Sequence, residues 1–138
     1  MGAEPAKIID VTCALIVDGD KMVFAAQRSS KMNLPLKWEL PGGKIEPNET
    51  AEACLIRVIA EELTIEIEIV KRLVPSTHSY PAIIVRLIPF ICKQANGKID
   101  LKEHTNFKWL HPNELLDLDW ADADVPILKQ YLNYLNAL

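Results

Sequence analysis

The feature that most constrains the fold of this chain is an unbroken run of good helix formers over residues 50–63, followed at once by an alternating segment. Thr50 is suited to cap such a helix, and Glu52 lies in the first turn, where the helix dipole favours an acid. Residues 65–69 alternate isoleucine and glutamate with a period of two, which is typical of a half-buried strand. The pattern predicts a helix leading directly into a strand, as in folds where helices pack on a sheet.

The rest of the chain predicts more strands and a second long helix. Apolar and β-branched residues over 8–18 and 21–27, with turn residues between them, favour a β-hairpin. The other predicted elements are a loop over 29–37, a short strand at 38–40, strands near 82–93 and 105–110 with a turn at Asn96 and Gly97 between them, a helix start at 111–114 and a helix over 125–135. We therefore expect an α/β (α+β) sandwich, a mixed β-sheet flanked by helices.

Length and composition favour a single soluble domain. The chain has 138 residues, of which 49% are hydrophobic and 25% charged, enough to bury one core. No segment is apolar enough to span a bilayer, and residues 1–6 lack the pattern of a secretory signal, so we expect a cytoplasmic protein. The three cysteines, Cys13, Cys54 and Cys92, lack a C-x-x-C pair and are interpreted as buried small hydrophobic residues.

The charge distribution constrains the partners. The net charge is −4 and no Lys/Arg cluster exceeds two neighbours, which argues against a polymeric nucleic acid. Nothing in the sequence indicates a membrane partner. If the ligand is a small polyanion, an acidic protein must supply positive charge locally, through a few Arg or Lys side chains or a bound divalent cation.

The helix over 50–63 carries a candidate metal site. A helical wheel groups the aliphatic Leu55, Ile56, Ile59 and Leu63 on one face and places Cys54, Arg57, Val58, Glu61 and Glu62 opposite. Adjacent carboxylates are costly to bury unless a cation sits beside them. Gly42 and Gly43, just upstream, allow a close approach of backbone carbonyls, and hard cations such as Mg²⁺ prefer such oxygens. The alternative, a solvated acidic face after a Gly-Gly turn, remains open on helix physics alone.

The spacing of these residues resembles the Nudix box, G-x5-E-x7-R-E-U-x-E-E-x-G-U, in which U is aliphatic. The matching residues are Gly43, Glu49, Arg57, Ile59, Glu61, Glu62 and Ile65. The likeness covers nearly the whole chain and is strongest to the MutT and CTP pyrophosphohydrolase branch of the Nudix hydrolases. It implies a single Nudix hydrolase domain over residues 1–138 with a Nudix-type sandwich fold.

The resemblance assigns roles to individual residues. The metal would be held by Glu61, Glu62, the carbonyl of Gly42, and Glu103, which completes the metal site or assists the attacking water. Arg57 would orient the helix carboxylates, braced by Glu49. Arg28 is similar to a phosphate contact, for which its planar cationic group is suited. Lys44 is a second candidate for phosphate and equally a solvated side chain.

Nucleobase recognition is predicted at Asp124, in a stretch that resembles the base-recognition segment of this branch. A carboxylate can accept a hydrogen bond from the exocyclic amine of cytosine. An equally weighted alternative is that Asp124 caps the last helix. His78 and Tyr80 lie in a predicted loop and are interpreted as packing or surface residues rather than base contacts. His104 is interpreted as an orienting neighbour of Glu103.

Two positions depart from the Nudix box. Val58 stands where the branch has an acid that serves as metal ligand or general base, and valine can do neither. Three accounts remain open: compensation by the remaining acids, an introduced substitution, or a protein that binds nucleotide without hydrolysing it. Thr64 stands where a left-handed glycine ends the helix, so strain or a different cap is expected there.

The resemblance implies a Mg²⁺-dependent nucleoside triphosphate pyrophosphohydrolase, with Mn²⁺ as an alternative ion. Its products would be a nucleoside monophosphate and pyrophosphate, and its expected substrates are CTP, dCTP or an oxidised deoxynucleotide such as 8-oxo-dGTP. Two alternatives are a nucleotide-binding module weakened by Val58 and a Nudix hydrolase of another nucleoside diphosphate-linked substrate. We expect a small-molecule nucleotide as partner, and either a monomer or a homodimer.

Overall fold

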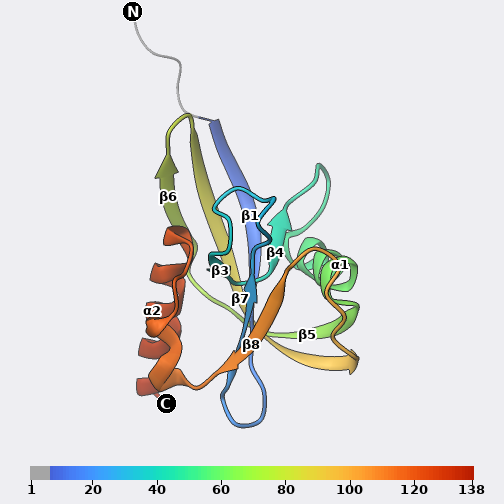
Figure 1. Cartoon of the computed structure of the whole chain (residues 1–138), viewed down its shortest axis with the longest axis vertical. Helices are drawn as coiled ribbons and strands as arrows, with labels where there is room; N and C mark the ends of the chain where they lie inside the picture. Colours follow the sequence, from blue (N-terminus) through green and yellow to red (C-terminus); the bar gives the residue numbers. More distant parts are fainter. Residues whose placement is uncertain (1–6) are drawn as a thin grey trace, which may run out of the picture.

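The computed structural model describes residues 7–138, and eight strands form two sheets between two long helices (Figure 1). The strands are β1 (Lys7–Ile16), β2 (Val23–Gln27), β3 (Trp38–Glu39), β4 (Gly42–Lys44), β5 (Ile65–Arg72), β6 (Ser76–Tyr80), β7 (Ile83–Gly97) and β8 (Asn106–Leu110). The helices are α1 (Ala51–Leu63), α2 (Val125–Asn136) and the short 3₁₀ helices η1 (Pro112–Asp117) and η2 (Asp122–Asp124). The expectations for residues 1–6 lie outside the described residues.

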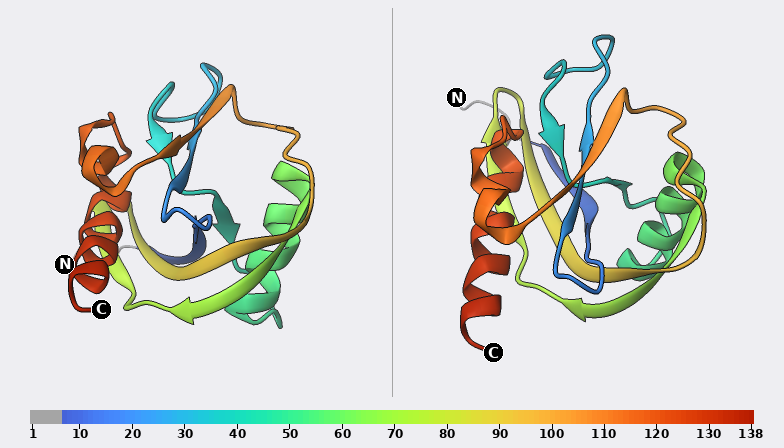
Figure 2. Two further views of the ribbon diagram at one scale, coloured as in Figure 1. Left: turned by 90° about the horizontal axis from the view of Figure 1, so that it is seen from below. Right: turned by 60° about the horizontal axis from the view of Figure 1, so that its bottom comes forward.

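The larger sheet is mixed, as predicted. β1 runs parallel to β7 and antiparallel to β4, while β5 and β6 pair antiparallel with different halves of the long β7. Figure 2 shows β7 curving from the side of α2 to the side of α1. A second sheet, in the order β3-β2-β8, is entirely antiparallel. The predicted α+β sandwich is confirmed.

β1 is covered on both faces, which explains its almost continuous apolar sequence. Because side chains alternate along a strand, Cys13 and Leu15 join the core under α2, whereas Ala14 and Ile16 join the core under α1. The chain thus builds two apolar clusters, one on each side of the same strand.

The predicted hairpin over 8–18 and 21–27 is wrong in its pairing. β1 and β2 belong to different sheets and meet only at an isolated bridge between Val17 and Val23. The turn residues connect the two strands as expected, but each strand finds its partners far away in the sequence.

Three local predictions also need correction. Gly42 and Gly43 do not form a Gly-Gly turn, because they begin β4 and pair with β1. His78 and Tyr80 lie on β6 rather than in a loop. Asn96 and Gly97 end β7 instead of forming a turn between strands, and Gly97 adopts a positive φ of 94° there. Short or polar strands carry weak period-two signals, so tertiary pairing decides them.

The helices follow the prediction closely. Thr50 caps α1 by accepting a hydrogen bond from the Ala53 N–H at 3.0 Å. Thr64 ends α1 in the left-handed region with φ 59°, as its position in the box implied. α2 matches the helix predicted over 125–135 and packs its apolar face, including the fully buried Ile127 and Leu128, on the sheet.

The helical wheel assigned two sides of α1 incorrectly. Cys54 and Val58 are buried, whereas Ile56 is 44% exposed. The reason is that β4 lies against α1 on the side of Val58, and a Cβ on Gly43 would meet the Val58 side chain at 3.0 Å.

No described helix is long and apolar enough to cross a membrane.

Candidate active site

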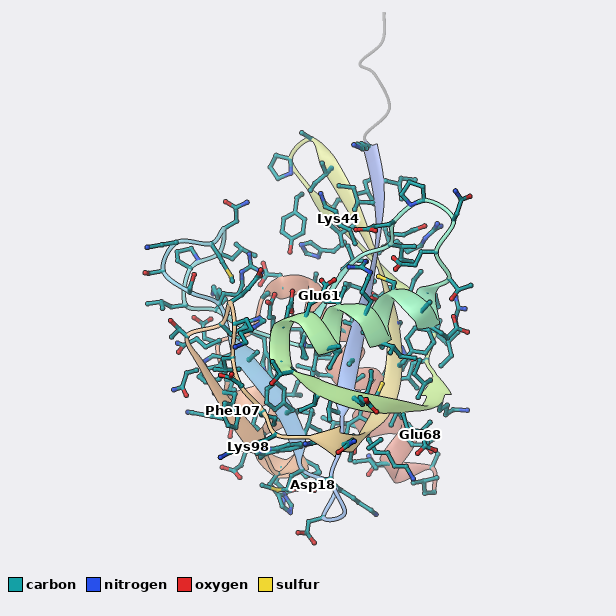
Figure 3. The ribbon with its side chains drawn as sticks, turned by 90° about the vertical axis from the view of Figure 1, so that its right-hand side faces the viewer. Asp18, Lys44, Glu61, Glu68, Lys98 and Phe107 are labelled. Atoms are coloured by element: carbon teal, nitrogen blue, oxygen red, sulfur yellow. The ribbon has the colours of Figure 1, made fainter. Side chains whose placement is uncertain are left out.

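A cavity of about 490 Å³ opens between β1, β4, the start of β7 and the loop that follows β2. The predicted substrate contacts Arg28, Lys44 and Asp124 all line it, and so does Gly42, the predicted carbonyl ligand. In Figure 3, Glu61 lies along the edge of α1 that is turned toward Lys44 on β4. The four predicted residues that line the cavity therefore come from three separate segments of the chain.

Glycine is required at position 42 because β4 lies tightly on β1. A Cβ on Gly42 would lie 1.9 Å from the carbonyl oxygen of Thr12, which no side chain can tolerate. Thr12 is itself fully buried and donates a hydrogen bond from its hydroxyl to the Gly43 carbonyl at 3.3 Å. The β1–β4 pairing and this hydroxyl hydrogen bond thus hold together two strands that line the cavity.

Asp124 is 5% exposed, and its Oδ2 accepts a hydrogen bond from the Leu40 N–H at 3.3 Å. Asp124 occupies the N-cap position of α2, as the alternative expected, but its side chain makes no capping hydrogen bond to the helix. Burial raises the pKa of Asp124 well above its usual value, and the nearby charge of Glu39 acts in the same direction. A carboxyl group inside the cavity therefore favours its neutral form.

Arg57 organises the acidic face of α1. Its Nε donates to Glu49 Oε2 at 2.7 Å and its Nη2 donates to Glu49 Oε1 at 3.0 Å, a bidentate pair. This contact lowers the pKa of Glu49 to about 2. Nη1 reaches Glu61 at 3.3 Å, one turn later on the helix. The geometry agrees with the predicted orienting role of Arg57 and the bracing role of Glu49.

Glu62 differs from the other acidic residues of α1 because one of its carboxylate oxygens is buried and unpaired within the described chain. Its Oε2 is buried and has no hydrogen-bond partner among residues 7–138. Burial raises the pKa of Glu62 to about 7, and the carboxylates of Glu39, Glu61 and Glu103 act in the same direction. A buried, unpaired carboxylate oxygen is unfavourable unless a cation or a proton meets it.

These residues fit a divalent ion. Glu61 and Glu62 on α1 and the exposed Glu103 offer hard carboxylate oxygens, and Glu62 has one that is unpaired. Within the part of the chain described by the structure, no three His, Cys, Asp or Glu side chains converge closely enough to form a complete ligand set. Water and phosphate oxygens would have to complete the coordination, as is usual for Mg²⁺.

Glu39 is a candidate site residue that the sequence did not indicate. It lines the cavity, and its two oxygens accept hydrogen bonds from Arg28 Nη1 at 2.7 Å and His104 Nε2 at 2.8 Å. Although burial opposes it, these contacts hold the pKa of Glu39 below its usual value. Its position beside the buried Trp38 in a two-residue strand was the available signal, because alternation turns Glu39 to the other face.

Glu39 also links the two halves of the site. Arg57, Glu61, Glu62 and Glu103 do not line the cavity, whereas Glu39 lines it and contributes to the raised pKa of Glu62. His104 was expected to orient Glu103, but its hydrogen bond goes to Glu39. Glu39 therefore pairs with Arg28, one of the predicted substrate-binding residues, and its charge also acts on Glu62 among the acidic residues of α1.

Comparison with known proteins shows the family of this chain. The family model of the NUDIX domain matches residues 7–131. The CTP pyrophosphohydrolase of Escherichia coli strain K12 is 30% identical over 126 residues, covering 91% of this chain and 93% of that protein. The 8-oxo-dGTP diphosphatase of Proteus vulgaris is 32% identical over 97 residues, covering 70% of this chain and 87% of that protein.

A solved structure of a Nudix hydrolase has the same fold. The solution structure of the DNA mismatch repair protein MutT, a Nudix hydrolase from methicillin-resistant Staphylococcus aureus 252, is 39% identical. It superposes with a TM-score of 0.76 over 94% of this chain and 99% of that one.

This chain belongs to the NUDIX domain family. The prediction that it is an enzyme, a hydrolase of the pyrophosphohydrolase class, is confirmed. Nudix hydrolases generally use divalent metal ions, which agrees with the unpaired oxygen of Glu62.

Proposed function

We propose that the protein is a Mg²⁺-dependent nucleoside triphosphate pyrophosphohydrolase that converts a (deoxy)nucleoside triphosphate and water into the monophosphate and pyrophosphate. The observation that carries the proposal is the cavity. Arg28 and Lys44 supply positive charge there, Asp124 supplies a buried carboxyl group, and Glu39 connects them to the acidic end of α1. A polyphosphate with a base at one end matches this distribution of charge.

The roles follow from position. Arg28 and Lys44 would contact the phosphates, with Arg28 as the planar, always charged partner. Glu61, Glu62, Glu103 and the Gly42 carbonyl would hold the divalent ion, and Arg57 would keep Glu61 turned toward it. The ion, Mg²⁺ or in its place Mn²⁺, would neutralise the triphosphate and lower the pKa of the attacking water.

Asp124 supports a proposal for the preferred base. Because burial favours its neutral form, this carboxyl group offers one donor and one acceptor. Cytosine presents a ring nitrogen acceptor beside its exocyclic amine donor, which complements that pair. We therefore propose CTP or dCTP as the preferred substrate, and an oxidised deoxynucleotide such as 8-oxo-dGTP as the next candidate. The two relatives above carry names that refer to these same nucleotides.

The proposal extends to the whole chain. We propose one Nudix domain over residues 1–138, of which residues 7–131 match the family model. A cytoplasmic location, where nucleoside triphosphates occur, fits this activity, with the protein acting as a monomer or a homodimer on a small-molecule nucleotide.

A substrate panel tests the proposal. Ribo- and deoxynucleoside triphosphates, a dinucleoside polyphosphate and a nucleotide sugar are incubated with the protein in Mg²⁺ or in Mn²⁺, and monophosphate, pyrophosphate and orthophosphate are measured separately. We expect pyrophosphate, with cytidine nucleotides turned over fastest, and Glu62→Gln as the impaired control. Turnover confined to the dinucleotide or the nucleotide sugar would replace the proposal with another Nudix substrate. No turnover of any compound, by the protein or by Val58→Glu, would reject hydrolysis of triphosphates.

A further inference from the structure

His104 is buried beside the cavity without lining it. Its side chain is 2% exposed, and its Nε2 lies 2.8 Å from Glu39 Oε2. Since an ionised carboxylate only accepts hydrogen bonds, Nε2 is the donor. Nδ1 is buried and has no partner among residues 7–138. The imidazole therefore cannot touch a nucleotide in the cavity, and any effect on one must pass through Glu39.

The hydrogen bond from His104 also limits how Glu39 can pair with Arg28. With Oε2 held by His104, only Oε1 accepts from Arg28, through Nη1 at 2.7 Å. Arg28 is held on its other side by Nε, which donates to the Asn33 carbonyl at 2.6 Å. These two contacts use Nε and Nη1, so Nη2 is left for a phosphate oxygen in the cavity.

We propose that His104 is a positioning residue for substrate binding, which acts through Glu39 to keep Arg28 available to the phosphates. This inference rests on the proposed function. Without the donor at position 104, Glu39 Oε2 would be buried and unpaired. Rotation of the carboxylate would then pair both of its oxygens with Arg28, because bidentate contacts are the preferred geometry of this ion pair. Arg28 would turn toward Glu39 and away from the phosphates.

The kinetic consequence is specific. Arg28 is expected to bind the phosphates before and during the reaction alike, so its withdrawal raises KM and leaves kcat nearly unchanged. A general loss of structure would instead lower kcat or the amount of folded enzyme. The effect should also be reversed by a side chain that returns an N–H to the same place. Glutamine does so, since its amide nitrogen extends about as far from the backbone as Nε2 of histidine.

The test compares His104→Ala, His104→Gln and the wild-type chain, with His111→Gln as the matched control. His111 is exposed and caps η1, outside this network. With CTP and Mg²⁺, we expect KM to rise about tenfold in His104→Ala, the size of one lost hydrogen bond to a charged group, with kcat within about threefold. His104→Gln should recover most of the loss, and His111→Gln should match the wild type.

A measurement on the wild-type fold supplements the kinetics. In protein with ¹⁵N-labelled histidine, the Nε2 proton of His104 should give a slowly exchanging resonance that moves or disappears in Glu39→Gln. An unchanged KM in His104→Ala, no recovery in His104→Gln, or a resonance indifferent to Glu39→Gln would each overturn the inference. Failure of the proposed function looks different, because the wild type itself would then hydrolyse no triphosphate.

Discussion

Val58 is the residue at which this chain departs most clearly from its family. It is 5% exposed, and its methyl groups lie against the backbone of Gly43. The Nudix box has an acid at this position. The apolar side chain of Val58 therefore occupies the space in which the resemblance implies a carboxylate. The remaining acids of the site are partly committed elsewhere, since Glu49 and Glu61 pair with Arg57. Glu62 retains the unpaired oxygen.

Val58→Glu should make both activity and stability depend more strongly on metal. If the valine has replaced an essential base, the rate should rise by about 10² to 10⁴, the usual contribution of a general base. Without metal, the buried carboxylate should lower the free energy of unfolding by about 1–3 kcal/mol. Mg²⁺ or Mn²⁺ should restore that loss, because an ion that binds only the folded state stabilises it.

Urea unfolding in EDTA and in excess Mg²⁺, together with steady-state rates, checks this prediction. Val58→Gln is the matched control, because glutamine has the size of glutamate but is a poorer metal ligand. This variant should remain destabilised in Mg²⁺. A glutamate variant with equal stability in both buffers and the rate of the wild type would show that position 58 plays no part in metal binding.

At the scale of elements, α1 connects the core to the site. Its buried stripe, with Leu55, Ile59 and Leu63, packs on the sheet, and its other edge carries the acidic residues. The helix begins with a regular cap at Thr50 and ends under strain, because Thr64 adopts a left-handed conformation that suits glycine. The Thr64 hydroxyl offsets part of this cost through a hydrogen bond to the Lys98 carbonyl at 3.0 Å.

Thr64→Gly should therefore stabilise the protein, by about 1 kcal/mol if the relief of strain exceeds the loss of the hydroxyl contact. Ala60→Gly, at an exposed position inside the same helix, should destabilise by a similar amount, about 1 kcal/mol. Both values come from urea denaturation at one pH. The account of the C-cap would be wrong if the two glycine variants lost stability equally.

At the scale of the whole molecule, the site exists because two sheets and two helices meet around β1. β4 supplies Gly42 on one side of β1, and β7 supplies another wall of the cavity from the other side. The second sheet contributes Glu39 through β3, while η2 contributes Asp124 ahead of α2. The close contact between β1 and β4 is the joint on which the cavity depends.

Gly42→Ala should disrupt that joint. The new Cβ would overlap the Thr12 carbonyl oxygen at 1.9 Å, so β4 would have to move away from β1. Overpacking of this kind costs about 1–3 kcal/mol or more, and nucleotide binding should weaken as well. Gly19→Ala is the control, because nothing lies within 4 Å of its Cβ, and its stability should stay within about 0.5 kcal/mol of the wild type. Equal stability of the two variants, measured by urea denaturation, would contradict the tight β1–β4 contact.

The sequence by itself determined the extent of α1, the strand that follows it, and the family. Helix α1, its cap at Thr50, the left-handed Thr64 and the alternation in β5 all depend on neighbouring residues, and periodicity reports such features directly. The Nudix box is also local, which is why its residues could be predicted as a set.

Only the tertiary structure decided which side chains meet. Glu39 and His104 are 65 residues apart, and Leu40 and Asp124 are 84 apart, so no local pattern could pair them. The same holds for the burial of Val58, which follows from the position of β4, and for the separation of β1 and β2 into two sheets. Local periodicity reports which face of an element is apolar, but long-range strand pairing chooses the neighbours of that face, and those neighbours create the site.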